Sequence, residues 1–520
     1  MRGYGSYMAH ATKVIPNLYR DSISLMQLSA MLAALPGVNE VSAIMATPAN
    51  LALLTEAGLE RGRIAAGPND LLIALRGKNS GALEAALAAA VAALDKPTPS
   101  VTSGVPGEVQ PRSLQMGLAR SPEANLALIS TPGEYAAAEA MKALRLGLNV
   151  MLFSDNVELD DEIALKRYAR ARDLLVMGPD CGTAIISGVP LGFANGVRRG
   201  AIGVVGASGT GTQQVTCLVH RHGAGISHAI GTGSHDLHRD VGGITMLQGI
   251  GALAADESTK VIVLVSKPPA PEVAQVVLGE AMQCGKPVVV NFIGAAPASI
   301  RGENLYQATT LEHAALAAVA LARGRKPVGA RPRALPPVRI GRMLSSQRYV
   351  RGLYSGGTFC YEASMLLGAS LGEVWSNASI DPKLRLRNVR KSKGHTLIDL
   401  GDDEFTRGRP HPMIDFRLRN ERLLAEAADR EVAVILLDVV LGFGAHPDPA
   451  AELVPVIEQA RIAARRKGRN IAFIGFVCGT ELDPQGLERQ EQALRAAGML
   501  VAGSNAQAVR LADSIAGARQ

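Results

Sequence analysis

One strand–turn–helix pattern occurs twice in this chain of 520 residues and constrains its fold more than any other feature. The first copy runs from Ala201 to Gln214 and the second from Tyr349 to Ala363. Each copy begins with an apolar strand, passes through a turn rich in Gly, Ser and Thr, and leads into a helix. Glycine lets the backbone approach a ligand, and the first amides of a helix have no partner within it. Each copy is therefore a candidate anion site, although tight helix–sheet packing alone also requires such turns.

The segments that follow the two copies also match in kind, because each copy is followed by two apolar strands. These strands are 261–265 and 287–292 after the first copy, and 432–438 and 471–476 after the second. An internal repeat of such a long period is rarely accidental. We therefore expect two related α/β modules, module one at 201–322 and module two at 349–520.

The remainder of the chain divides into two further α/β units. Residues 1–95 alternate strand and helix three times, which predicts a small N-terminal domain of β-α-β-α-β-α order. A linker rich in Pro, Gly and Ser at 96–117 precedes a parallel α/β unit at 118–200. A Pro/Arg-rich segment at 323–348 connects the two modules, and module two contains an insert near 383–425. The predicted fold class is α/β and multidomain.

Composition narrows the class of protein. The content of 47% hydrophobic and 19% charged residues is ordinary for a soluble globular protein. No apolar run reaches the ~18–20 residues that span a bilayer, and the first residues lack the apolar core of a secretory signal. The five cysteines form no Cys-x-x-Cys pair, which fits a reducing cytoplasm. We expect a cytoplasmic protein with no membrane partner.

The net charge of +7 is concentrated in one segment. Residues 323–348 contain eight Lys or Arg and no Asp or Glu, so the rest of the chain is nearly neutral. Nucleic-acid-binding proteins usually spread basic residues over a folded face and interleave aromatic residues, which make up only 4% of this chain. We therefore expect no nucleic-acid partner.

Several motifs resemble those of a known family. Gly178-Pro179-Asp180-Cys181-Gly182 resembles the turn that closes the CoA-binding domain of the succinyl-CoA synthetase α subunit. Ser208-Gly209-Thr210 resembles the helix start of its ligase domain, and the segment from Gly356 to Ala363 resembles the same motif. With residues 16–22 and 66–73, the whole chain resembles the FdrA family.

That resemblance implies an acyl-CoA-synthetase-like architecture with a succinyl-CoA ligase fold. It implies an N-terminal α/β domain at 1–95, a CoA-binding-like Rossmann-type domain at 118–200, and two ligase-type flavodoxin-like domains at 201–322 and 349–520. It also implies a subunit of a carbamoyltransferase, which splits oxalurate with phosphate into oxamate and carbamoyl phosphate beside separately encoded partner subunits. CoA is the one cofactor that the resemblance introduces, and its binding stays open.

Three departures from the synthetase pattern limit the resemblance. The segments 294–304 and 477–484 contain no histidine, so no phosphohistidine forms there. The Thr-Gly-x-Gln-Gly turn that binds the CoA pyrophosphate is replaced by Thr131-Pro132-Gly133-Glu134, whose carboxylate would repel phosphate. No stretch resembles an ATP-grasp domain. These departures argue against a self-sufficient, ATP-driven acyl-CoA ligase.

The two helix starts predict a site for a phosphate or a carboxylate, suited to carbamoyl or acyl transfer. Its candidate residues are Ser208, Gly209, Thr210, Gly211 and Thr212 from module one, and Ser355, Gly356, Gly357 and Thr358 from module two. Glu362, further along the second helix, is either a catalytic orienting or acid/base group or a solvated carboxylate without a role. The resemblance to the succinyl-CoA synthetase motif implies that Glu362 occupies the position of a glutamate that faces the phosphohistidine of that family.

A polar loop at 231–240 contains the densest histidine cluster, which includes His235. Histidines at i and i+3 beside carboxylates could ligate a metal, but a loop over the site is the preferred interpretation. There His235 would act on the substrate and Arg239 would bind a carboxylate, so we expect no metal. The segment 442–448 is the expected equivalent loop of module two, and Asn377 is a further candidate on the same side.

Three functions remain open at this stage. The first is a carbamoyltransferase subunit of the oxamate type, an enzyme with a small anionic substrate and partner subunits. The second is a subunit of an NDP-forming acyl-CoA synthetase, which would bind CoA. The third is a non-catalytic anion-sensing or scaffold protein.

Overall fold

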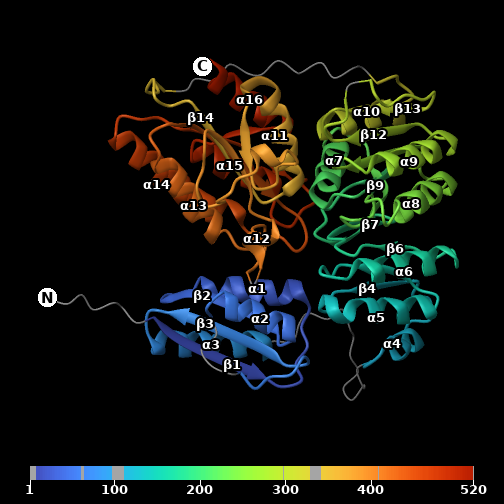
Figure 1. Cartoon of the computed structure of the whole chain (residues 1–520), viewed down its shortest axis with the longest axis horizontal. Coiled ribbons are helices and arrows are strands. Elements are labelled where there is room, and N and C mark those ends of the chain that lie inside the picture. Colours follow the sequence, from blue (N-terminus) through green and yellow to red (C-terminus); the bar gives the residue numbers. More distant parts are fainter. Residues whose placement is uncertain are drawn as a thin grey trace.

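A computed structural model describes residues 8–59, 64–95, 111–296, 298–327, 341–407 and 409–518. Four sheets define four α/β domains, and this confirms the predicted fold class. In Figure 1 the N-terminal domain lies beneath module two, and a small three-stranded domain lies beneath module one. Among the helices that the structure describes, none combines the length and apolar character needed to cross a bilayer.

The N-terminal domain has the predicted order of elements. They are β1 (Ala9–Ile15), α1 (Ser22–Ala33), β2 (Val38–Met45), α2 (Pro48–Glu56), β3 (Leu71–Gly77) and α3 (Ser80–Asp95). The sheet is antiparallel with the order β1-β3-β2. Asp21 begins α1, because its carboxylate accepts a hydrogen bond from the Ser24 amide at 3.0 Å.

The small domain is a parallel sheet of order β4-β5-β6. Its elements are α4 (Leu114–Arg120), β4 (Leu126–Ile129), α5 (Gly133–Arg145), β5 (Asn149–Leu152), α6 (Leu159–Arg170) and β6 (Val176–Met177). The helix α4 occupies the end of the expected linker, and 96–110 lies outside the described residues. The domain ends before the predicted residue 200, because β7 (Thr183–Ile186) and β8 (Val189–Gly192) join the sheet of module one.

Module one has a seven-stranded sheet of order β13-β12-β11-β9-β10-β7-β8. Its other elements are β9 (Arg199–Gly206), α7 (Gly209–Arg221), β10 (Ile226–Gly231), α8 (Ile244–Ala255), β11 (Val261–Ser266), α9 (Pro271–Gln283), β12 (Val288–Phe292), β13 (Leu305–Gln307) and α10 (Leu311–Ala322). The five parallel strands have the flavodoxin-like order 2-1-3-4-5. Every residue of β11 is buried, as expected for a parallel strand covered on both faces.

Module two has a six-stranded parallel sheet of order β15-β16-β14-β17-β18-β19. Its strands are β14 (Tyr349–Tyr354), β15 (Val374–Ser376), β16 (His395–Asp399), β17 (Val432–Val440), β18 (Ala472–Cys478) and β19 (Leu500–Ala502). Its helices are α11 (Gly357–Leu371), η1 (Pro382–Leu384), α12 (Asp403–Thr406), α13 (Arg417–Ala428), α14 (Pro449–Arg466), α15 (Leu487–Ala496) and α16 (Asn505–Gly517).

The strands β16-β14-β17-β18-β19 repeat the order of module one, so the duplication that the sequence predicts is present in the fold. The expectation of an insert near 383–425 is wrong. This segment supplies β16, which pairs directly with β14, and the helix α13.

The two modules share one hydrophobic core, which contains Val215 and Leu311 of module one and Phe359 and Leu436 of module two. In this core α7 packs against α11. Polar contacts reinforce the interface, because Asn195 donates to the Leu441 carbonyl oxygen at 2.9 Å. The shared core therefore holds the two repeated helices against each other.

Candidate functional site

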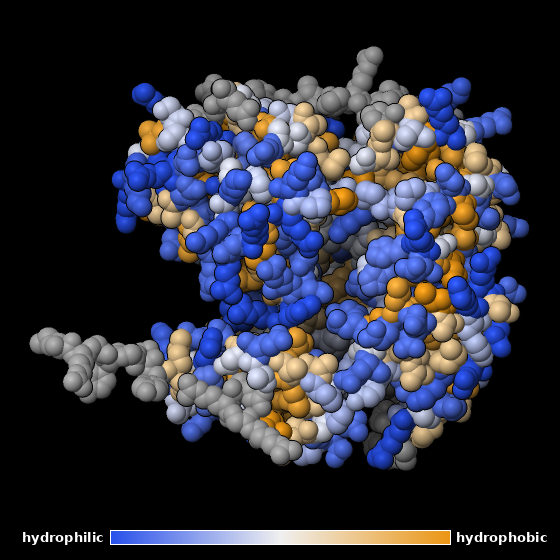
Figure 2. All heavy atoms as spheres, viewed as in Figure 1, coloured by the Kyte–Doolittle hydropathy of each residue, from blue (hydrophilic) through white to orange (hydrophobic). Residues whose placement is uncertain are grey.

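The two repeated helices begin at the same cleft, which has a volume of about 460 Å³. The hydroxyl oxygens of Ser208 and Thr358 lie 2.6 Å apart across it. The cleft also contacts residues that follow β10, β11 and β16, at the strand ends where open parallel sheets bind ligands. Figure 2 shows the surface hollowed near its centre, between module two and the domains opposite it. The prediction that both helix N-termini face one shared pocket therefore agrees with the geometry.

The N-terminus of α7 is open to this cleft. Ser208 begins the helix, and its hydroxyl accepts a hydrogen bond from the Gly211 amide at 3.0 Å. The amides of Gly209 and Thr210 have no acceptor among the described residues, and both residues line the cleft. Thr212 does not reach the cleft, because its buried hydroxyl lies against Gly206, where any Cβ atom would overlap it. The start of α7 thus presents two free amides, those of Gly209 and Thr210, and the Ser208 hydroxyl to a ligand in the cleft.

The N-terminus of α11 is partly filled by the protein itself. The carboxylate of Asp438 accepts hydrogen bonds from the Ser355 and Gly356 amides, each at 2.8 Å, and from the Ser355 hydroxyl at 2.9 Å. Arg419 donates to the same carboxylate at 2.8 Å, and the Arg419 and Asp438 side chains are both buried. The predicted anion-binding role of the Ser355 and Gly356 amides is therefore wrong, because a carboxylate already occupies them.

Asp399 is a carboxyl group of the cleft that the sequence reasoning missed. It ends β16, and a Cβ atom on Gly357 would overlap its Oδ2 atom. Burial raises the pKa of Asp399 to about 6, although nearby Lys267 opposes this shift. Asn377 donates to the Asp399 carbonyl oxygen and accepts from the Asp399 amide, both at 2.9 Å. Asn377 does not line the cleft and instead holds the backbone at Asp399.

Histidines line both sides of the cleft. His235 and His238 lie in the loop after β10, with ring centroids 5.1 Å apart. His411 lies in the loop after β16, and its Nδ1 atom accepts from the Met413 amide at 3.2 Å. Burial lowers the pKa of His411 to about 4, so its neutral ring carries a proton on Nε2.

The module-two equivalent of the histidine loop differs from the prediction. The strand β16 takes the place of β10 beside the central strand, so the equivalent loop is 400–411. The expected equivalent at 442–448 follows β17, the counterpart of β11, and it does not line the cleft.

Two further residues of the cleft were not predicted as site residues. Lys267 follows β11 directly, and its exposed side chain lines the cleft. Its place after a parallel strand was the signal that could have identified it. Asp180 lies in the Gly178–Gly182 turn with a left-handed φ of 56°. Desolvation raises the pKa of Asp180 to about 6, while a hydrogen bond from Ser234 opposes that shift.

Glu362 and Arg239 lie away from the cleft, contrary to the roles predicted for them. Glu362 is fully buried and accepts hydrogen bonds from the Leu311 amide at 2.7 Å and from Asn505 Nδ2 at 2.8 Å. It therefore caps the N-terminus of α10, and burial raises its pKa to about 7. Arg239 is largely exposed and forms an ion pair with Glu272 on α9. Neither residue touches the site.

The small domain does not fit the pyrophosphate of CoA. In a Rossmann-type unit the pyrophosphate lies at the N-terminus of the helix that follows the first strand. Here that helix is α5, and a Cβ atom on Gly133 would overlap the carbonyl oxygens of Asp155 and Asn156. Glu134 adds a negative charge to the first turn. The N-terminal domain also covers this edge, because the Tyr19 hydroxyl donates to the Ser130 carbonyl oxygen at 3.1 Å.

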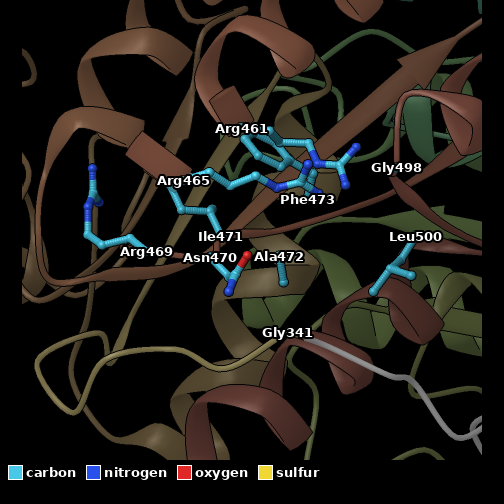
Figure 3. Close-up of a pocket in the computed structure, with 10 residues that line it drawn as sticks. All are labelled: Gly341, Arg461, Arg465, Arg469, Asn470, Ile471, Ala472, Phe473, Gly498 and Leu500. Atoms are coloured by element: carbon cyan, nitrogen blue, oxygen red, sulfur yellow. The ribbon is translucent and has the colours of Figure 1, made fainter. Parts of the chain in front are cut away.

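A second, basic pocket of about 250 Å³ lies at the amino ends of β18 and β19, where the strands begin rather than end (Figure 3). Arg461 donates to the Ala497 carbonyl oxygen, just beyond the end of α15. Arg469 donates to the carbonyl oxygens of Ala427 and Asp429, and in Figure 3 its side chain lies apart from those of Arg461 and Arg465. These arginines stabilise helix C-termini. The cleft remains the better candidate site.

Three protein families match parts of this chain, and together with the fold they show which class of protein it is. The family described as "CoA-ligase" matches residues 353–515, and "CoA binding domain" matches 197–294. The family described as "AllF, heavy metal-associated domain" matches 8–110, although no group of three or more metal-binding side chains occurs within the described residues. The match to "CoA binding domain" lies in the segment that we expected to be the first ligase-type domain. Fold and matches together define an acyl-CoA-synthetase-like protein.

Similarity over almost the full length identifies the family. YahF of Escherichia coli (strain K12) is 44% identical over 497 residues, which cover 94% of this chain and 95% of YahF. The chain therefore belongs to the FdrA-like, acyl-CoA-synthetase-like family that includes YahF.

More distant similarities are partial. The alpha subunit of succinate–CoA ligase [ADP-forming] from Staphylococcus epidermidis is 28% identical over 34% of this chain and 58% of that subunit. The apo form of the dinucleotide-forming acetyl-coenzyme A synthetase 1 of Ca. Korarchaeum cryptofilum is 15% identical, with a TM-score of 0.32, over 76% of this chain and 83% of that chain.

Proposed function

We propose that this chain is a subunit of a transferase that moves a carbamoyl group between an oxamate-type amide and phosphate in the cleft between the modules. The observation that supports this most is the convergence of two helix N-termini on one cleft that also contains Lys267. Free helix amides and an ammonium group together favour a small ligand with more than one negative charge. Phosphate and a carboxylate-bearing substrate supply these charges.

In the direction of oxalurate cleavage, a phosphate oxygen attacks the ureido carbonyl carbon and a C–O bond forms. The C–N bond to the oxamate nitrogen then breaks. The phosphate loses one proton and the oxamate nitrogen gains one, so carbamoyl phosphate and oxamate leave. In this scheme the amides of Gly209, Thr210, Gly357 and Thr358 hold the phosphate, and the Lys267 ammonium group pairs with its negative charge.

Asp180 and Asp399 are the candidates for the proton transfer. The pKa of each is raised to about 6, so each exchanges protons near neutral pH. Both line the cleft, one on each side. A carboxyl group that is partly protonated at neutral pH can take the phosphate proton and deliver it to the leaving nitrogen.

A second candidate function is an acyl-CoA synthetase subunit, which the matches to "CoA-ligase" and "CoA binding domain" favour. The closed N-terminus of α5 leaves no place for the pyrophosphate in the small domain, but the matched segment 197–294 contains α7, whose N-terminus is open to the cleft. The two candidates therefore differ in the ligand that the chain binds.

Calorimetric titration with phosphate, carbamoyl phosphate and CoA tests the proposal. We expect the first two to bind, and Lys267→Met to weaken both by about tenfold or more, since a charged contact is worth about 1.5–3 kcal/mol. Lys260→Met is the matched control, because Lys260 is exposed before the other end of β11. Phosphate-dependent oxalurate cleavage is measured with and without the products of neighbouring genes. Binding of CoA without phosphate would overturn the proposal in favour of the second candidate.

A further inference from the structure

A buried charge cluster connects the small domain to the cleft. Lys166 on α6 donates to Glu162 Oε1 at 2.7 Å, to Asp236 Oδ1 at 2.8 Å and to the Thr232 carbonyl oxygen at 3.0 Å. The side chains of Lys166, Glu162 and Asp236 are each at most 1% exposed. Lys166 and Glu162 belong to the small domain, whereas Asp236 belongs to the histidine loop of module one. The cluster therefore joins two domains through charge.

The carboxylate oxygens of this cluster differ in whether they have hydrogen-bond partners. Asp236 also accepts from the Thr245 amide at 3.0 Å and the Met246 amide at 2.9 Å, so both of its oxygens are used at the start of α8. Glu162 Oε2 is buried and has no hydrogen-bond partner in the described part of the chain. It lies 3.4 Å from His235 Nδ1, which is an ion-pair distance. A buried charged oxygen without a hydrogen-bond partner is unfavourable, so the contact with His235 stabilises Glu162 Oε2.

The charge balance of the cluster favours a cation at His235. Two carboxylates and one ammonium leave one excess negative charge, and an uncompensated buried charge is strongly destabilising. Of the other groups that face His235, Asp180 favours its charged form and Lys166 opposes it. Glu162 is the largest influence and raises the pKa of His235. Burial and the neighbouring His235 lower the pKa of His238, so only one of the two rings is expected to be charged.

We propose that Glu162 is a positioning residue that holds the imidazole of His235 over the cleft as a cation, with Nδ1 toward the small domain and Nε2–H left for the bound anion. This inference rests on the proposed function, since it names a further contact of the same anion site. It gives the small domain a role in the cleft that does not require CoA. His235, predicted from the sequence as a catalytic residue, is the group through which Glu162 acts.

Nuclear magnetic resonance titration of the histidine side chains tests the contact directly. His235→Gln assigns the resonance, and the pKa of His235 is compared between the wild-type chain, Glu162→Gln and the control Glu158→Gln. Glu158 is exposed one turn earlier, at the start of α6. We expect a lower pKa of His235 in Glu162→Gln and an unchanged value in Glu158→Gln. An unchanged value in folded Glu162→Gln would overturn the proposal.

A second variant guards against a failure of Glu162→Gln to fold. Glu162→Asp keeps the negative charge beside Lys166 but withdraws the oxygen from His235, so the pKa of His235 is expected to fall by a smaller amount. Glu162→Gln itself leaves Lys166 and Asp236 as a balanced pair, which favours folding. A folded Glu162→Asp chain with an unchanged His235 titration would also overturn the proposal.

Phosphate affinity as a function of pH provides the second readout. In the wild-type chain the affinity should fall as the pH rises through the titration of His235. In Glu162→Gln the fall should begin at a lower pH, with about three- to tenfold weaker binding at pH 7. If the His235 titration shifts as expected but phosphate binds at no pH, the positioning role stands and the proposed function fails. If phosphate binds identically in both chains, the role of Glu162 at the site fails.

Discussion

The two repeated helix starts share a fold and a cleft but present different chemistry. In module one, Ser208 caps α7 and leaves the amides of Gly209 and Thr210 free. In module two, the equivalent cap is Gly356, and Asp438 fills the turn from inside the protein. The first helix start is therefore open to an anion, whereas the second is already partly neutralised.

This difference shows that a duplicated fold does not imply a duplicated site. A carboxylate buried at a helix N-terminus is stabilised by the same dipole that would bind phosphate. Because Asp438 and Arg419 occupy the turn of module two, the backbone amides that α11 leaves for a ligand are those of Gly357 and Thr358. The comparison leads to four predictions, from the largest expected effect to the smallest.

Removal of Arg419 should have the largest effect. Arg419→Met leaves the buried Asp438 carboxylate without its cation, which should lower the free energy of unfolding of module two by about 3–5 kcal/mol. Urea unfolding followed by the fluorescence of Trp375, the only tryptophan of the chain, measures this loss. Arg430→Met is the control, because Arg430 is exposed. Equal stability of the two variants would show that the helix amides alone sustain the charge of Asp438.

Glu362 should make module two less stable as the pH rises. Its pKa is raised from 4.5 to about 7 in the folded chain, so its stabilising contribution is complete below about pH 4.5 and is lost as the pH rises through 7. The total change is on the order of 3 kcal/mol. Gln214 occupies the same place in module one, six residues after the cap, so Glu362→Gln makes the two helices alike there.

The measurement for Glu362 compares unfolding at pH 5 and pH 8. The wild-type chain should lose stability between these pH values relative to Glu362→Gln. Phosphate affinity should remain unchanged, because Glu362 caps α10 rather than facing the cleft. A loss of phosphate binding in the folded variant would restore the catalytic role that the sequence predicted.

Substitution of the first helical glycine should distinguish the two helix starts. A methyl group on Gly357 would overlap the carboxyl group of Asp399, whereas on Gly209 it would meet Thr183 Oγ1 at 3.3 Å. Gly357→Ala should therefore cost about 1–3 kcal/mol through overpacking. Gly209→Ala should stay within about 0.5 kcal/mol, as surface substitutions usually do. Thermal unfolding of both variants measures the difference, and equal midpoints would refute it.

Arg239 should have the smallest effect. Its side chain is 78% exposed and forms an ion pair with Glu272 at the surface, outside the cleft. Arg239→Ala should therefore leave phosphate affinity unchanged, in contrast to Lys267→Met. Calorimetric titration of both variants under the same conditions makes the comparison. Weaker phosphate binding by Arg239→Ala would mean that the loop at 231–240 closes over the ligand.

Much of the fold was predictable because its signals are local. Apolar runs, glycine turns and cap residues such as Asp21 and Ser208 identify strands and helix starts within a few residues of sequence. The duplicated order of these elements then predicts two parallel sheets and a pair of helix N-termini. The contact between Ser208 and Thr358, 150 residues apart, agrees with this prediction.

The parts of the site that were not predicted depend on partners distant in the chain. The segment near 383–425 looked like an insert because its composition is polar, yet β16 lies beside the central strand. Glu362 was predicted as a site residue because it follows the Gly-, Ser- and Thr-rich turn of the second copy of the repeat. Its side chain instead points to α10. A sequence pattern shows how residues are spaced along a helix. It does not show which other element each face of that helix packs against.

The sequence alone determined the α/β class, the repeat and the presence of two helix N-termini, because backbone propensity and hydrophobic periodicity act over short distances. Only the tertiary structure decided which amides are free. Asp438 reaches Ser355 across 83 residues, and Glu162 reaches His235 from another domain. Such pairings arise when the packed cores bring charged groups together out of water, and there each buried charge must find a partner.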